Sequence, residues 1–136
     1  MHVMTMLALW DRKISSAEIA GSVRTNPAII RKLIIKLKRA GLVKAARGGT
    51  GGYQLGKDSG SISIQDVFLA VGESLFVPAP SVPNSKCPIG AHMTEVLEGI
   101  YCGADRAIET QFRGQTLADL ATQIREKEGI QAEAGT

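Results

Sequence analysis

The stretch from Asn26 to Gly41 constrains the fold of this 136-residue chain more than any other. Asn26 is a favoured N-cap residue, and Pro27 suits the first helical position because its missing N–H would have no intrahelical partner there. Gly41 follows the last apolar turn, where helices commonly end in left-handed backbone, and Leu42 is placed for the accompanying apolar contact. These signals predict a helix over residues 27–40. Its buried side is expected to carry Ile30, Leu33, Ile34 and Leu37.

Two shorter helices are predicted before it. Ser15 and Glu18 stand in the capping-box pattern, in which each side chain satisfies a backbone N–H at the start of a helix. The helix that they open has Ile19, Ala20 and Val23 as its apolar side. An earlier apolar run over residues 3–10 indicates a short helix, with Met4, Leu7 and Ala8 pointing inward.

Only Arg24 and Thr25 separate the second and third predicted helices. Two helices joined by so brief a turn, the second with a basic outer side, are typical of a helix-turn-helix, in which the second helix enters the major groove of DNA. The alternative is a small helical domain whose basic side is merely solvated. The distribution of charge along the chain favours the first interpretation.

Charge is divided unevenly between the two halves. The net charge is +3, yet residues 1–60 carry 11 Lys or Arg against 3 Asp or Glu, while residues 61–136 carry 5 against 10. No acidic residue lies between Glu18 and Asp58. A solvated surface usually mixes the two signs, so this acid-free block indicates a polyanionic partner. Its basic residues are Arg24, Arg31, Lys32, Lys36, Lys38, Arg39, Lys44, Arg47 and Lys57.

The segment RGGTGGY, residues 47–53, joins two short β-prone runs at residues 42–46 and 52–55. Glycines adopt positive φ without a Cβ penalty, which predicts the tip of a tight hairpin, a β-wing beside the basic helix. A slack linker is disfavoured because two matched β-prone runs flank it. A phosphate-binding loop is disfavoured because Asp58 follows Gly56 and Lys57, where such a loop needs Ser or Thr.

These residues carry a resemblance to a known family. The run from Ser15 to Leu55, ending in RAGLVKAARGGTGGYQL, resembles the winged helix-turn-helix of the Rrf2 family of bacterial transcriptional regulators, and the likeness continues through SISIQDVFLAVG and TLADL. In that family the recognition helix and the wing contact DNA. Together with its neighbouring residues, the set that the resemblance implies for DNA binding is Arg24, Thr25, Asn26, Ala28, Ile29, Arg31, Lys32, Lys36, Arg47, Gly48, Thr50 and Tyr53.

Family members usually begin well before the segment that matches His2 to Trp10. The first helix is therefore expected to be truncated here, or the chain to start downstream of its natural beginning.

Three more helices are predicted in the second half. Ser63 and Asp66 form a capping pattern for a short helix that Gly72 ends, and a Pro-rich loop follows over residues 76–88. A long helix is expected over residues 89–112. Thr116 and Asp119 then cap a last helix, whose apolar residues are Leu117, Leu120, Ala121 and Ile124.

The long helix carries a near-heptad apolar seam and therefore needs a partner. We expect a two-fold homodimer through this helix, as in the resembling family, with two recognition helices one DNA turn apart, roughly 34 Å. The alternative is that the helix folds back over its own winged domain. The seam consists of Met93, Val96, Leu97, Ile100, Ala104, Ala107, Ile108 and Gln111.

The chain has two cysteines, Cys87 and Cys102. Family members that hold an iron–sulfur cluster use three closely spaced cysteines, and only Cys87 lies in the corresponding region. We therefore expect no metal and no cofactor, and a place in the branch of the family without the cluster cysteines. Cys87 follows Lys86 and begins the long helix, where positive charge and the helix dipole favour a thiolate. This suggests redox sensing through Cys87, alone or with Cys102; the alternative is that both thiols are inert.

The predicted fold is mainly α with a small β-wing. It comprises a winged helix-turn-helix domain over residues 1–75, the Pro-rich loop 76–88, dimerisation helices over 89–128, and a disordered tail over 129–136. No apolar run is long enough to span a membrane and no export signal is visible, so we expect a cytoplasmic protein.

The predicted function is that of a homodimeric regulator of transcription, expected to be a repressor, that binds an inverted-repeat operator in double-stranded DNA. An enzyme is disfavoured because His2 and His92 are isolated and no catalytic set is visible. The remaining alternatives are a protein-interaction module and a regulator that answers to a small ligand rather than to redox chemistry.

Overall fold

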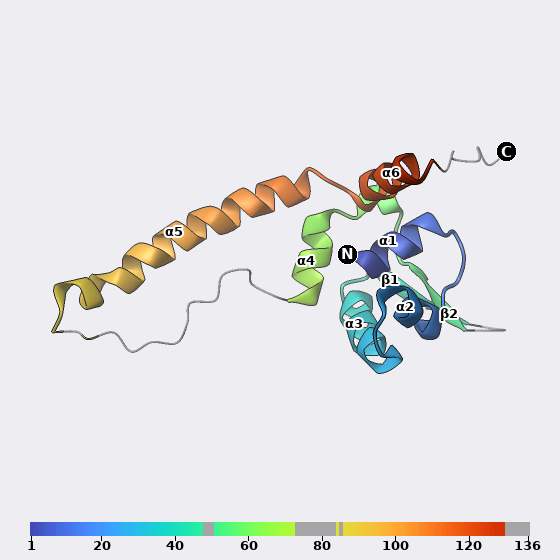
Figure 1. Cartoon of the computed structure of the whole chain (residues 1–136), viewed down its shortest axis with the longest axis horizontal. Helices are drawn as coiled ribbons and strands as arrows, with labels where there is room; N and C mark the ends of the chain where they lie inside the picture. The colour runs from blue at the N-terminus through green and yellow to red at the C-terminus, as the bar shows by residue number, and fades with distance from the viewer. Residues whose placement is uncertain (48–50, 73–83, 85, 130–136) are drawn as a thin grey trace.

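The computed structural model describes residues 1–47, 51–72, 84 and 86–129 (Figure 1). The predicted fold class is confirmed: the described residues form six α-helices and a two-stranded antiparallel wing. In chain order the elements are α1 (His2–Leu9), α2 (Ser16–Val23), α3 (Pro27–Arg39), β1 (Val43–Ala46), β2 (Gly52–Leu55), the 3-10 turn η1 (Ser59–Ser61), α4 (Ile64–Val71), α5 (Pro88–Arg113) and α6 (Leu117–Glu128).

The helix ends follow the predicted capping chemistry. The capping boxes at the starts of α2, α4 and α6 are all complete, with both the side-chain and the backbone hydrogen bond in place. Asn26 caps α3 by accepting a hydrogen bond from the Ala28 N–H. Beyond the other end of α3, Gly41 has φ +73° and donates to the Lys38 carbonyl, and Leu42 donates to Leu37. These two bonds are those of a Schellman motif, which directs the chain from α3 into β1.

The hydrophobic core lies between α1, α2, α3, α4 and α6. The predicted buried side of α3 is confirmed, since Ile30, Ile34 and Leu37 are each at most 2% exposed. Helix α1 is covered more completely than its sequence suggested, with every residue from Val3 to Leu7 buried. The reason is that α2, α6 and β2 pack against different sides of α1. The largest fully buried side chains are Met4, Ile14, Ile19, Ile30, Ile34, Leu37, Ile62 and Leu117.

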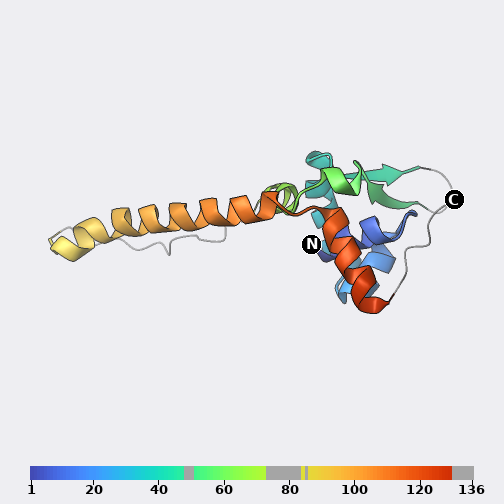
Figure 2. The same ribbon diagram turned by 90° about the horizontal axis from the view of Figure 1, so that it is seen from above.

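Helix α6 returns to the N-terminal part of the molecule and packs against α1 and η1 (Figure 2). The segment before it pairs with the segment before α4 through an antiparallel bridge between Ser63 and Thr116. Leu117 is 0% exposed, and its N–H donates to the Ile62 carbonyl. The sequence predicts this helix as one of the dimerisation helices over 89–128. In the structure its apolar side packs into the core of the winged unit.

Helix α5 projects away from the rest of the molecule (Figures 1 and 2). It contacts the body mainly through α4, where the rings of Phe68 and Phe112 meet edge to face with centroids 5.7 Å apart. None of its 26 residues, all of which are described, is buried. Within the described part of the chain, no helix is both long and apolar enough to cross a membrane.

Candidate nucleic-acid interface

The turn between α2 and α3 sets the direction in which α3 leaves the core. Arg24 adopts left-handed backbone with φ +57°, the one non-glycine residue of the described chain to do so. The N–H groups of Arg24 and Thr25 both donate to the Ala20 carbonyl, which ends α2 tightly. Asn26 then starts α3 two residues later. A helix-turn-helix therefore forms, with the apolar side of α3 on the core.

The outer side of α3 carries four of the twelve predicted DNA contacts near the start of the helix. Ala28, Ile29, Arg31 and Lys32 are all exposed, and Ile29 leaves 58% of its surface open. Arg31 donates weakly to the Pro27 carbonyl of its own helix, at 3.4 Å. Within the described residues, no basic residue of the acid-free block forms an ion pair. Their charges are therefore not neutralised by the protein itself.

Lys36 is placed differently from the other predicted contacts. Its Nζ donates to the Val71 carbonyl at 3.0 Å, at the end of α4. Carbonyls at a helix C-terminus carry partial negative charge and attract cations. In this arrangement Lys36 ties α3 to α4 instead of standing free on the outer side.

The wing is a hairpin in which Val43 pairs with Leu55 and Ala46 with Gly52. Arg47 is exposed directly after β1, while Gly48 and Thr50 lie outside the described residues. Tyr53 is half-buried and packs against the core, so only part of its side chain is open to a partner.

A third short strand segment, which the sequence did not reveal, anchors the wing. Ile14 and Tyr53 exchange two backbone hydrogen bonds of 3.1 and 2.8 Å. Next to this bridge, a Cβ on Gly52 would lie 3.1 Å from the Ile14 backbone. A side chain at position 52 would therefore crowd the Ile14 backbone, and one glycine of RGGTGGY has a structural role away from the tip.

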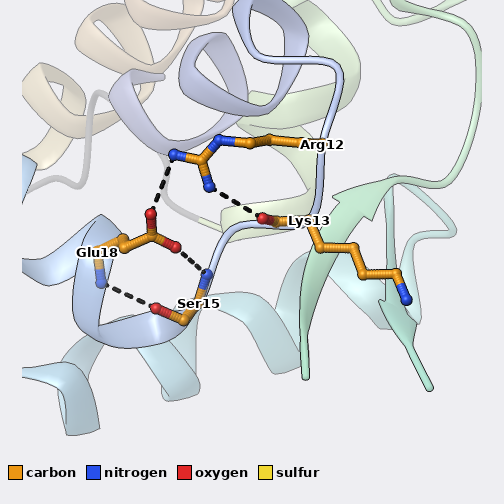
Figure 3. A network of polar contacts seen from close by, with 4 residues as sticks. All are labelled: Arg12, Lys13, Ser15 and Glu18. Atoms are coloured by element: carbon orange, nitrogen blue, oxygen red, sulfur yellow. Dashed lines mark hydrogen bonds and ion pairs between the residues drawn. The ribbon is translucent and has the colours of Figure 1, made fainter. Parts of the chain in front are cut away.

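Lys13 and Arg12 support this region from the connection between α1 and α2. The Lys13 Nζ donates to the Arg47 carbonyl at 3.3 Å and so braces the wing where β1 ends and the tip begins. Arg12 forms an ion pair with Glu18 at 3.0 Å and also donates to the Lys13 carbonyl (Figure 3). Neither basic residue was predicted to be functional, because both precede the acid-free block.

Glu18 joins the capping box of α2 to this network. Its carboxylate accepts from the Ser15 N–H at 3.0 Å, while its own N–H donates to the Ser15 hydroxyl (Figure 3). The Ser15 amide, followed by the Arg12 side chain, lowers the pKa of Glu18 below its ordinary value. The last carboxylate before the basic block is thus held charged and paired, which limits its repulsion of a polyanion.

The comparisons with known proteins agree with this geometry. A sequence model of the Rrf2 family, described as "Iron-dependent Transcriptional regulator", matches residues 1–123. The chain belongs to the Rrf2 family. The resemblance found in the sequence is therefore confirmed, together with the fold that it implied, and the protein is a DNA-binding winged-helix regulator of transcription.

Three relatives show how far the likeness extends. YwnA of Bacillus subtilis, provisionally named an HTH-type transcriptional regulator, is 34% identical over 125 residues, covering 90% of this chain and 92% of YwnA. The structure of T. potens IscR superposes with a TM-score of 0.67 at 26% identity, over 98% of this chain and 86% of that one. CymR, the global cysteine regulator of B. subtilis, gives a TM-score of 0.64 at 25% identity, over 90% and 89% of the two chains.

The description of the Rrf2 family mentions iron, but the cysteines of this member do not fit an iron–sulfur cluster within one subunit. Such clusters take four protein ligands, mostly thiolates, whereas this chain has two cysteines. Cys87 caps α5 and Cys102 lies within it. Fifteen residues of helix separate the two thiols by about 22 Å, so they cannot ligate one cluster in the same subunit.

Replacing Glu18 with Gln tests the network at the start of α2. A carboxylate with a lowered pKa stabilises the folded chain above its ordinary pKa of 4.5, and this contribution is lost as the pH falls through the folded value. We expect Glu18→Gln to lower the free energy of unfolding at neutral pH and to have little effect in strong acid, measured by chemical denaturation. Glu126→Gln, on the exposed side of α6, is the control. An equal loss at both pH values would contradict the role of the charge.

Proposed function

We propose that this Rrf2-family protein is a homodimeric repressor that binds an inverted-repeat operator through α3 and the wing, in the cytoplasm. The observation that carries the proposal is the exposed basic side of α3, which forms no ion pair within the described residues, together with the exposed Arg47 directly after β1. In helix-turn-helix proteins the second helix presents its N-terminal residues to base edges in the major groove. Ala28, Ile29, Arg31 and Lys32 occupy that part of α3.

The remaining basic residues suit contacts with the DNA backbone. Lysines and arginines that neutralise phosphates release counterions, and this makes affinity fall with salt. Arg47, directly after β1 at the start of the wing tip, is placed to enter a narrow minor groove, where the negative potential is high.

A second copy of the chain is the proposed partner of α5. Ile89, Met93, Val96 and Ile100 are 44–67% exposed and follow one side of this helix at heptad spacing. A two-fold axis along this side would bury the four side chains against their equivalents in the second copy. The same symmetry would relate two α3 helices, which accounts for the expected inverted repeat. Such a dimer on an operator overlapping a promoter would exclude the polymerase, which is why we propose repression.

We propose further that Cys87 responds to oxidants. The amides of Gly90 and Ile89 lower the pKa of its thiol, and the side chain is half-buried at the start of α5. A thiolate attacks hydrogen peroxide to give a sulfenic acid, with hydroxide as the leaving group. A structure of CymR from Staphylococcus aureus, 25% identical over 88% of this chain, is titled as an oxidized form. Oxidation at the start of α5 would alter the dimer helix and thereby the spacing of the two α3 helices.

Arg47→Ala should weaken binding to the cognate duplex by about 1–3 kcal/mol, because the guanidinium contacts the groove. Lys57→Ala is the matched control, since it removes the same charge after β2, beside Asp58, and should cost much less. Fluorescence anisotropy with duplexes selected from genomic fragments measures the affinity of both variants. Equal losses in the two variants would reduce Arg47 to a general electrostatic contributor.

For the unmodified protein, the logarithm of the affinity should fall with the logarithm of the salt concentration, by about 0.9 per phosphate neutralised. Salt-independent binding, or binding without preference for an inverted repeat, would favour a protein-interaction module.

Val96→Glu should convert the dimer to a monomer, because it places a charge in the centre of the proposed seam. Ala91→Glu introduces the same side chain on the opposite side of α5, at 100° per residue, and should leave the dimer intact. Sedimentation equilibrium at several protein concentrations distinguishes the two. A Val96→Glu variant that sediments like the unmodified chain would show that the seam is not the interface.

Mild oxidation with peroxide should change operator affinity in the unmodified protein and in Cys102→Ser, but not in Cys87→Ser. Anisotropy titrations with reduced and oxidised samples measure this, and mass spectrometry identifies the modified thiol. If Cys87→Ser still responds, or if oxidation of Cys87 leaves the affinity unchanged, the protein answers to another signal, such as a small ligand.

A further inference from the structure

A cleft of about 600 Å³ lies where the end of α1, the wing, the η1 turn and α6 meet. Its volume falls within the range of small-molecule sites, about 300–1,000 Å³. Leu7 and Leu55 are among its apolar lining residues, and the described lining includes no residue of α3. The cleft is therefore separate from the side of the molecule that presents α3 to DNA.

Positive charge dominates the lining of this cleft. Lys44 extends from β1, Lys57 follows β2, and Arg125 comes from α6. None of these three side chains has a hydrogen bond or an ion pair within the described residues, and Arg125 is half-buried. Arg12 is a fourth cation on the lining, but it is already paired with Glu18.

Two carboxylates accompany these cations. Asp58 is engaged, because its Oδ2 accepts from the Gly60 N–H at 3.0 Å and caps η1. Asp11, on the connection after α1, makes no ion pair within the described residues. Two carboxylates within the lining would repel a continuous phosphate backbone running through the cleft. A compact anion can instead lie against the cations and offer a hydroxyl or ammonium group to Asp11.

We propose that this cleft binds a small anion with at least two negative charges, of the phosphate or polycarboxylate class, through Lys44, Lys57 and Arg125. Cations brought together from three separate elements repel one another, and an anion between them offsets that cost. Charge-assisted hydrogen bonds to such groups are among the stronger polar contacts. The bound anion joins α6 to both sides of the open end of the wing hairpin, whose first strand leads to Arg47.

The fluorescence of Trp10 reports directly on binding of an anion in the cleft. It is the one tryptophan of the chain, it lines the cleft at 45% exposure, and the Arg12 guanidinium lies 5.5 Å from the centre of its ring. The full chain is titrated with inorganic pyrophosphate and, separately, with citrate, while Trp10 emission is followed in the absence of DNA. We expect a saturable change with at least one of the two probes. Sodium chloride at matched ionic strength should not reproduce it.

Two double variants test whether the anion binds in this cleft. Lys57→Ala combined with Arg125→Ala should raise the half-saturating concentration about tenfold or more, because each removes a hydrogen-bond donor to a charged group. Arg106→Ala combined with Lys127→Ala removes the same charge from exposed positions outside the lining and should change the half-saturating concentration little. Circular dichroism confirms that each variant is folded. Failure of both probes, reproduction by sodium chloride, or equal weakening by the two double variants would overturn the proposal.

A separate DNA-binding measurement tests whether these cations bind a free anion or the phosphates of DNA. Arg125→Ala should bind duplex DNA as tightly as the unmodified protein in buffer free of polyvalent anions. If it loses affinity to the extent that Arg47→Ala does, these cations serve the DNA backbone and the small-anion site is refuted. The two measurements also distinguish failure of this proposal from failure of the proposed function, because the titration of Trp10 involves no DNA.

Discussion

Burial of the apolar side of α3 is the constraint on which the rest of the structure depends. Ile30, Ile34 and Leu37 are almost fully enclosed, and burying each such side chain stabilises the fold by about 1.5–3 kcal/mol. Because a helix has 3.6 residues per turn, enclosing one side leaves the opposite side in solvent. The basic residues of α3 are therefore presented outward as a consequence of core packing. The Schellman motif after Arg39 then sends the chain into β1, so the position of the wing follows from the same helix.

Some charged side chains of the molecule form ion pairs, while other cations have no acidic partner within the described residues. Arg12 and Glu18 neutralise each other where the carboxylate would otherwise face a polyanion. The cations on α3, and Lys44, Lys57 and Arg125 at the cleft, form no ion pair within the described residues, and mutual repulsion destabilises such groups when they are left alone. An anionic partner offsets that repulsion. A nucleic acid on α3 and a small anion beside α6 would thus each stabilise the folded protein by mass action.

The chain belongs to the Rrf2 family, but its two cysteines do not supply the ligands that an iron–sulfur cluster needs within one subunit. Ligands of a cluster must converge within a few ångströms, and helical geometry holds Cys87 and Cys102 far apart in one subunit. The same helix that separates the thiols exposes Ile89, Met93, Val96 and Ile100 along one side. In this chain α5 is suited to joining two subunits, with Cys87 at its N-terminal end, where backbone amides lower the pKa of the thiol.

Local signals in the sequence determined the helices, their caps and the wing. The capping boxes, the Asn26–Pro27 start and the Gly41 end are interactions between residues a few positions apart, so their patterns are visible without a fold. Contacts between distant segments were decided only by the tertiary structure. These include the bridge between Ile14 and Tyr53, the bond from Lys36 to Val71, the packing of α6 on α1, and the meeting of Lys44, Lys57 and Arg125 at one cleft. Each depends on the path of the whole chain through space, which no local spacing of residues encodes.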